Sequence, residues 1–125
     1  MARKPSSTLT EAELRLMKVV WQKGPSKVQE VVDGLPEKEQ VAYSTVLTTL
    51  RILEDKGYLK HEKQGRAYVY HPLVGPEEVR MNVLRYMLGS FFDDSPELLV
   101  SNLIEGGELE EAELEKIRRM IEEAE

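Results

Sequence analysis

The feature that most constrains the fold is the apolar stripe in the stretch YSTVLTTLRILED, residues 43–55. Val46, Leu50 and Leu53 are spaced i, i+4 and i+7, which predicts an α-helix with one buried face. Gly57 follows shortly after, and glycine is the residue type that most often ends a helix in a left-handed conformation. The chain is therefore expected to bury this face and then change direction.

A β-hairpin is predicted directly after this helix. Residues 58–62 and 67–70 contain aromatic and branched side chains typical of strands. The four residues between them, Lys63-Gln64-Gly65-Arg66, form a basic turn with the glycine that hairpin turns favour.

Two further helices are predicted before this pair. Thr10 and Glu13 have the spacing of a capping box and mark the start of the first helix, which a Gly-Pro pair ends. Ser26 and Gln29 repeat the spacing and predict the start of a short second helix. Three helices and a hairpin in this order indicate a winged helix-turn-helix, in which the third helix enters the DNA major groove.

The chain after Pro72 contains only helical patterns. We therefore expect a mainly α protein with a small β-hairpin: a winged-helix DNA-binding domain over residues 1–73 and a helical dimerisation region over 74–125. About 50 residues are too few to bury that much apolar surface alone, so a homodimer is the simplest arrangement. Packing of the tail onto its own winged helix is the alternative. The expected interface residues are Leu84, Met87, Leu88, Phe91, Leu114, Ile117 and Ile121.

The charge is unevenly distributed along the chain. Residues 1–72 contain 12 basic and 9 acidic residues, a balance of +3, whereas residues 73–125 contain 5 and 14, a balance of −9. The two balances add to the net charge of −6. A basic first half is compatible with nucleic acid, although solvated surfaces would also account for the split.

Several functions are disfavoured by the residues and motifs that the sequence lacks. There is no cysteine, the two histidines are isolated, and no glycine-rich phosphate loop is present, so we expect no enzyme activity, no metal and no cofactor. The polar start of the sequence and the lack of a long apolar run predict a cytoplasmic protein without membrane insertion.

The predicted third helix has an unusual exposed face. Hydroxyl residues are mediocre helix formers, but their short side chains allow close approach to a groove and can bond to phosphates or base edges. Basic residues one turn further along, on the turn of the hairpin and at the chain start suit contacts to the DNA backbone. The candidate contacts to double-stranded DNA are Ser44, Thr45, Thr48, Thr49, Arg51, Lys63, Arg66, Arg3 and Lys4.

Two long segments resemble the BlaI/MecI family of penicillinase and methicillin-resistance repressors. They are LTEAELRLMKVVWQKG, with the pattern E-x-x-L-M-x-x-V-W, and VAYSTVLTTLRILEDKGYLKHEKQGRAYVYHPLV, with the wing pattern R-x-Y-x-Y. The tail SPELLVSNLIEGGELEEAELEKI also has the family's form, so the resemblance covers almost the whole chain.

The resemblance implies a homodimeric repressor that binds a two-fold-symmetric operator, with Thr45, Thr48 and Arg66 at contacting positions. In the best-known members a transmembrane sensor protease cuts the repressor after an Asn that precedes Phe. The matching bond here is Asn102–Leu103. Leu47 is a second departure, because the resistance repressors tend to have a basic residue there. A copper-sensing branch of the family uses cysteine pairs, which this sequence lacks.

Two other readings remain open from the residues alone. The winged helix could be a protein-interaction module, in which case substitution of Thr48 and Arg66 would leave function intact. The chain could also be a ligand-sensing regulator with a pocket between wing and tail, although no convergent polar cluster indicates one.

Overall fold

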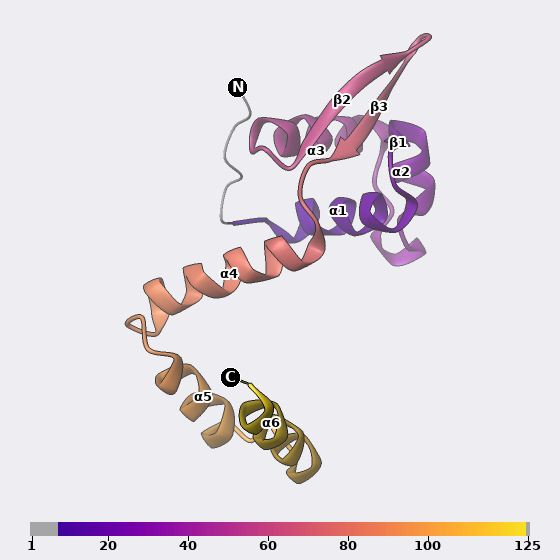
Figure 1. Ribbon diagram of the computed structural model, residues 1–125. Coiled ribbons are helices and arrows are strands. Elements are labelled where there is room, and N and C mark those ends of the chain that lie inside the picture. Colours follow the sequence, from indigo (N-terminus) through magenta and orange to yellow (C-terminus); the bar gives the residue numbers. More distant parts are fainter. Residues whose placement is uncertain (1–7, 125) are drawn as a thin grey trace. The chain divides into compact units, whose positions relative to one another are not determined.

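The computed structural model describes residues 8–124, so the predicted contacts Arg3 and Lys4 lie outside the described residues. The elements in chain order are α1 (Glu11–Lys23), β1 (Ser26–Lys27), α2 (Val28–Gly34), the 3₁₀ turn η1 (Glu37–Glu39), α3 (Tyr43–Asp55), β2 (Leu59–Gln64), β3 (Ala67–Pro72), α4 (Pro76–Phe91), α5 (Pro96–Glu105) and α6 (Glu111–Glu123). The chain divides into two compact units, residues 1–84 and 85–125, and the division falls within α4 (Figure 1). Within residues 8–124, no helix has the length and apolar character needed to span a bilayer.

Helix α1 begins with the predicted capping box. The hydroxyl of Thr10 accepts the N–H of Glu13 at 3.1 Å, and the Glu13 carboxylate accepts the N–H of Thr10 at 2.9 Å. Two of the N–H groups that a helix start leaves unpaired are satisfied in this way. The helix ends at Gly24, whose φ is +83°.

The predicted capping box at the start of α2 is wrong. Ser26 is buried in strand β1, where it pairs with Tyr70, and its hydroxyl donates to the carbonyl of Gly24 at 2.7 Å. The residue before the helix is Lys27, whose N–H donates to the Glu30 carboxylate at 2.9 Å. Strand pairing with a distant segment has displaced the helix start by one residue.

Helix α3 has the predicted buried face. Val46, Leu50 and Leu53 are fully buried, and Gly57 follows the helix with φ +92°. The stripe packs into a core formed by α1, α2, α3 and the sheet. The largest fully buried side chains of this core include Met17, Val20, Val31, Tyr58, Leu59 and Tyr70.

The sheet is antiparallel in the order β1-β3-β2. Gln64 pairs with Ala67, so a two-residue turn with Gly65 at φ +62° joins β2 to β3. This hairpin projects beyond the helices of the N-terminal unit (Figure 1). The predicted fold class, a mainly α winged helix-turn-helix, is confirmed, and β1 adds a short third strand to the predicted hairpin.

The C-terminal unit consists of the end of α4 with α5 and α6. Ser95 caps α5, its hydroxyl accepting the N–H of Leu98 at 3.0 Å. None of residues 85–124 is buried. The large apolar side chains left exposed in this unit are Tyr86, Phe91, Leu98, Val100, Leu103, Ile104, Leu114, Met120 and Ile121.

Candidate nucleic-acid interface

The polar face of α3 is exposed along its first three turns. Ser44, Thr45, Thr48 and Arg51 are all exposed, on the same helix as the fully buried stripe. Thr49 is half-buried, and its hydroxyl donates to the carbonyl of Thr45 at 2.8 Å. The Thr49 proton is therefore used within the helix, while its oxygen can still accept a hydrogen bond.

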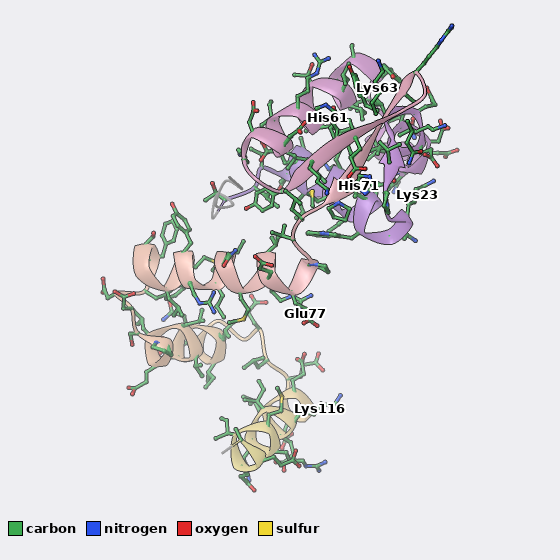
Figure 2. The ribbon with its side chains drawn as sticks, turned by 45° about the horizontal axis from the view of Figure 1, so that its top comes forward. Lys23, His61, Lys63, His71, Glu77 and Lys116 are labelled. Atoms are coloured by element: carbon green, nitrogen blue, oxygen red, sulfur yellow. The ribbon has the colours of Figure 1, made fainter. Side chains whose placement is uncertain are left out.

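The β2–β3 hairpin, which we call the wing, presents two exposed basic residues at its tip. Lys63 pairs with Tyr68 near the end of the hairpin (Figure 2), and Arg66 lies in the turn itself. Both side chains are exposed on a narrow two-stranded ribbon, which suits contact with a phosphate backbone.

A groove of about 410 Å³, which we call the basic groove, lies between α2, α3 and the wing. It brings together Lys27, Arg51 and Arg66, and none of the three forms an ion pair with a carboxylate among residues 8–124. The remaining lining residues are Val28, Gln29, Tyr43, Leu47, Ala67 and Tyr68. Three unpaired cations on one concave surface favour an anionic partner.

The polar and aromatic lining residues that were not predicted as DNA contacts are Lys27, Gln29, Tyr43 and Tyr68. Lys27 directly precedes α2, and Gln29 is the second residue of that helix. A helix start is a favoured place for phosphate contacts, and this position is the signal that could have indicated both residues. The half-buried Leu47 packs against the core at the edge of this groove, so its departure from the family pattern falls on the candidate DNA surface.

Tyr70 lies behind this surface and links it to the core. Burial raises the pKa of its phenol; the Glu54 carboxylate adds to the rise, while the charge of Arg51 and a hydrogen bond with it oppose it. The phenol is therefore neutral at physiological pH. Its contact with Arg51 connects an exposed cation of α3 to the sheet.

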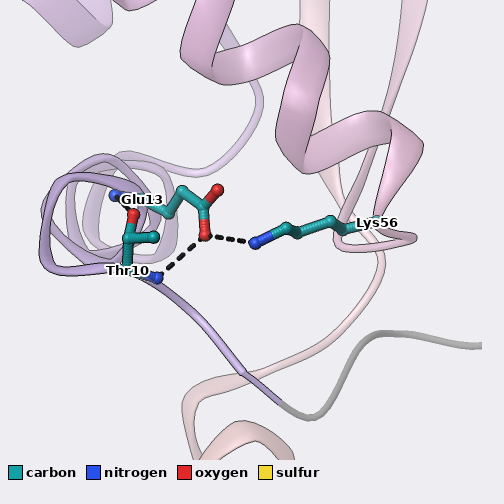
Figure 3. Close-up of polar contacts among 3 residues, drawn as sticks. All are labelled: Thr10, Glu13 and Lys56. Carbon is teal, nitrogen blue, oxygen red and sulfur yellow. Dashed lines mark hydrogen bonds and ion pairs between the residues drawn. The ribbon is translucent and has the colours of Figure 1, made fainter.

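A partly buried ion pair ties the end of α3, the proposed recognition helix, to α1. Lys56 Nζ lies 2.8 Å from Glu13 Oε1, the same oxygen that accepts the Thr10 N–H (Figure 3). Burial by itself would raise the pKa of Glu13, but the hydrogen bonds from Lys56 and Thr10 outweigh it and hold the pKa below its ordinary value. The carboxylate is therefore charged, and α1 and α3 are fixed to each other at this end.

Among residues 8–124, no three His, Asp or Glu side chains form a cluster suited to a metal ion. The two histidines instead lie on the strands of the wing (Figure 2).

The exposed hydroxyl-bearing helix, the basic groove and the projecting hairpin define a winged-helix DNA-binding protein. The sequence model of the penicillinase repressor family matches residues 9–123, and the chain belongs to this family. It is 29% identical over 115 residues to the penicillinase repressor of Bacillus licheniformis, an alignment that covers 92% of this chain and 90% of that protein.

Two solved structures agree with this assignment. The solution structure of the DNA-binding domain of the repressor BlaI matches with a TM-score of 0.53 and 33% identity, covering 61% of this chain and 93% of that one. The solution structure of monomeric Bacillus licheniformis BlaI in complex with the blaP half-operator matches with a TM-score of 0.50 and 33% identity, covering 62% and 93%. The chain is therefore a DNA-binding transcriptional repressor and not an enzyme, as predicted.

Proposed function

We propose that this repressor binds a two-fold-symmetric operator as a homodimer, with α3 in the major groove and the wing on the phosphate backbone. The observation that carries the proposal is the basic groove, which places Arg51 of α3 and Arg66 of the wing on one surface. The match to a structure bound to a half-operator supports the same use of this surface. We also propose that it acts in the cytoplasm, together with the DNA it binds.

Each side chain of the interface has a distinct proposed role. Ser44, Thr45 and Thr48 approach the groove floor, where their hydroxyls bond to base edges or phosphates. Arg51, Lys63 and Arg66 neutralise phosphates, as we also propose for Arg3 and Lys4 at the chain start. Thr49 contributes as an acceptor only, because its proton is already donated to Thr45.

The test of DNA binding is a gel shift with duplex DNA from the region upstream of the gene that encodes this chain. Affinity is expected to fall steeply with salt, because each neutralised phosphate releases counterions. Thr48→Ala should weaken the specific complex, and Arg66→Ala should weaken binding and reduce the salt slope by about one. The control Lys116→Ala removes one positive charge from α6 and should leave affinity unchanged. Binding that ignores salt, or no binding to the duplex, would overturn the proposal.

The C-terminal unit supports the homodimer. Phe91 is 69% exposed and Ile121 is 68% exposed, and no residue of 85–124 is buried within a single chain. Such surfaces are normally covered by a partner. We propose that α4, α5 and α6 meet their copies through Leu84, Met87, Leu88, Phe91, Leu114, Ile117 and Ile121.

Light scattering after size-exclusion chromatography tests this dimer. The wild-type chain should elute at twice its chain mass of 14.3 kDa, and Ile121→Glu should shift it toward the monomer because it places a charge in an apolar interface. The substitution Glu122→Lys, on a polar position of the same helix, is the control. A monomeric wild-type chain would contradict the proposal.

We also propose that cleavage of the Asn102–Leu103 bond relieves repression. Both residues are exposed on α5, three and two residues before its end at Glu105, and Gly106 and Gly107 directly follow the helix. A protease requires an extended substrate, and a helix end flanked by glycines unfolds locally at low free-energy cost. Cleavage would remove α6 and with it part of the proposed dimer interface. The resulting monomers would each bind one half-site and would lose the binding energy of the second.

Immunoblots of cells under inducing conditions test this mechanism. The repressor should appear as a fragment ending near Asn102, and Asn102→Ala should remain intact and repressing. Derepression with a full-length wild-type repressor would refute cleavage and leave the DNA-binding proposal untouched.

A second candidate function, ligand sensing, is favoured by one observation. A groove of about 440 Å³ lies between α1 and the first half of α4 within the N-terminal unit. Its lining is mostly apolar and includes Trp21 and Val79. Lys18 and Arg80 also line it, and neither forms an ion pair among residues 8–124. We infer that a small amphipathic anion would suit it, with its apolar body in the groove and its charge on the two cations.

The single tryptophan of the chain lines this groove and reports on it directly. Decanoate should change Trp21 fluorescence in a saturable way, while decyltrimethylammonium, with the same chain length and opposite charge, should not. Equal responses to both would indicate nonspecific contact with apolar surface and remove this candidate.

A further inference from the structure

The recognition helix and the wing are joined by a side-chain contact that the proposed DNA interface does not use. Nδ1 of His61, on β2, lies 2.7 Å from Oε1 and 2.8 Å from Oε2 of Glu54, on α3. The backbone N–H of His61 also donates to Glu54 Oε2 at 3.3 Å. One carboxylate thus holds both the ring and the backbone of a single wing residue.

This contact lies at the outer edge of β2, which has no strand partner on that side. In the order β1-β3-β2, strand β3 is held on both sides, whereas β2 pairs with β3 alone. Two-stranded ribbons are marginally stable and readily twist. The Glu54 carboxylate accepts the N–H of His61 in place of a further strand, so it fixes the free edge of the wing to α3.

The ring of His61 extends the contact across the ribbon. Its centroid lies 4.9 Å from that of Tyr68, in an edge-on arrangement, and 5.7 Å from that of Tyr70. Tyr70 is buried and interacts with Arg51. The cluster therefore connects the base of the wing to an arginine that lines the basic groove.

We propose that Glu54 and His61 are positioning residues that set the angle between wing and recognition helix, a contact we call the Glu54–His61 clasp. The proposal rests on DNA binding through α3 and the wing. Thr48 and Arg66 lie on different elements, and both can engage one duplex only if the wing is held at a fixed angle to the helix. A wing held in advance also avoids the loss of conformational freedom on binding.

The direction in which DNA affinity changes when the Glu54 carboxylate is removed distinguishes a positioning role from a purely electrostatic one. Glu54 carries a negative charge on an element that faces DNA phosphates, so its removal should strengthen DNA binding if charge alone mattered. The clasp predicts the opposite, because loss of the carboxylate releases the free edge of the wing.

The experiment measures fluorescence anisotropy of a labelled duplex from the region upstream of the encoding gene, at one fixed salt concentration. Glu54→Ala should bind about tenfold more weakly, equivalent to the loss of one wing contact. Glu54→Gln keeps an acceptor oxygen for the His61 N–H and should restore most of the affinity. The control Glu62→Gln removes an exposed carboxylate from the same wing and should bind as tightly as wild type or more tightly.

A double-mutant cycle with Arg66→Ala shows whether the clasp acts through the wing. If it does, Glu54→Ala combined with Arg66→Ala should bind no more weakly than Arg66→Ala alone. His61→Ala removes the ring contact but keeps the backbone N–H that Glu54 accepts, so it should show a smaller loss of affinity that is also non-additive with Arg66→Ala. Trp21 fluorescence melting confirms which variants are folded.

Provided that Arg66→Ala weakens binding, two results would overturn the clasp: unchanged or tighter binding by folded Glu54→Ala, or additive losses in the cycle. Undiminished binding by Arg66→Ala would instead overturn the role of the wing in the proposed interface, and the clasp with it.

Discussion

Removal of the Glu13 carboxylate should destabilise the N-terminal unit more than removal of any exposed acid. Glu13 is 5% exposed, and its Oε1 atom accepts hydrogen bonds from the Thr10 N–H and from Lys56. Glu13→Ala leaves both donors without their partner. It also separates the start of α1 from the end of α3, which this pair holds together (Figure 3).

The size of the effect follows from the two bonds. Loss of the helix-cap interaction with Thr10 is expected to cost about 1 kcal/mol. Loss of the charge-assisted bond from Lys56 costs about 1.5–3 kcal/mol when the partner stays buried. The Lys56 side chain is 28% exposed and can turn toward water, which places this second contribution near its lower limit. The expected total is about 2.5 kcal/mol, or roughly 10–20 °C in Tm for a unit of this size.

Thermal unfolding followed by Trp21 fluorescence measures this effect in the N-terminal unit alone, because Trp21 is the only tryptophan and lies in α1. Glu13→Gln keeps an acceptor for Thr10 and should fall between wild type and Glu13→Ala. The control is Glu11→Ala in the same helical turn, whose side chain is 91% exposed and which should melt with the wild type. A Glu13→Ala protein that melts within about 2 °C of wild type would refute the reasoning.

The same carboxylate gives the stability a defined pH dependence. The pKa of Glu13 is lowered in the folded state, so its contribution is fully present above the unfolded value of about 4.3 and is lost as pH falls through the folded pKa. The difference in Tm between wild type and Glu13→Gln should therefore be constant near neutral pH and shrink below about pH 4. A difference that grows on acidification would contradict the assigned sign.

Three backbone positions give further predictions. Gly34→Ala should destabilise by about 1–3 kcal/mol, because an added Cβ would lie 2.6 Å from Cγ1 of Val19. Gly57→Ala should lower the free energy of unfolding by about 1–2 kcal/mol, because a φ of +92° is unfavourable for any residue with a Cβ. Trp21 fluorescence melting measures the stability of both glycine variants, and wild-type stability in either one would contradict the cause stated for it. Asp94, at φ +57°, tolerates this conformation as a short polar residue, so Asp94→Val should destabilise the α4–α5 turn by about 1–2 kcal/mol while Asp94→Asn should not, as measured by urea unfolding followed by circular dichroism.

The helices of the N-terminal unit could be predicted because their signals are local. Thr10 and Glu13 are three residues apart, and the α3 stripe repeats within a few turns, so the interactions that form these elements involve near neighbours. Strand β1 could not be predicted in this way. Ser26 is in a strand only because Tyr70, distant in sequence, offers it a partner, and this pairing overrides the local capping pattern.

The residues of the candidate interface also fall into those that local sequence signals could predict and those that they could not. The hydroxyl residues of α3 stood out in the sequence because they are poor choices for a surface helix, and Arg66 because it lies in a glycine turn. Lys27 and Tyr68 were not predicted as contacts, although Tyr68 belongs to the wing pattern R-x-Y-x-Y, because they join the basic groove only when α2 and the wing pack beside α3. The contact between Glu54 and His61 was equally hidden, because two common surface residues seven positions apart predict no bond across a helix and a strand.

Local sequence signals were therefore enough to predict which segments are helical, which face of α3 is buried, and the family to which the chain is similar. Capping, apolar spacing and glycine positions act over a few residues, and they keep their meaning before the chain is folded. The folded chain was needed to show which cations share one groove, how the wing is held against the recognition helix, and that the C-terminal unit buries none of its described residues. Those properties depend on contacts between distant segments, which exist only after the core has formed.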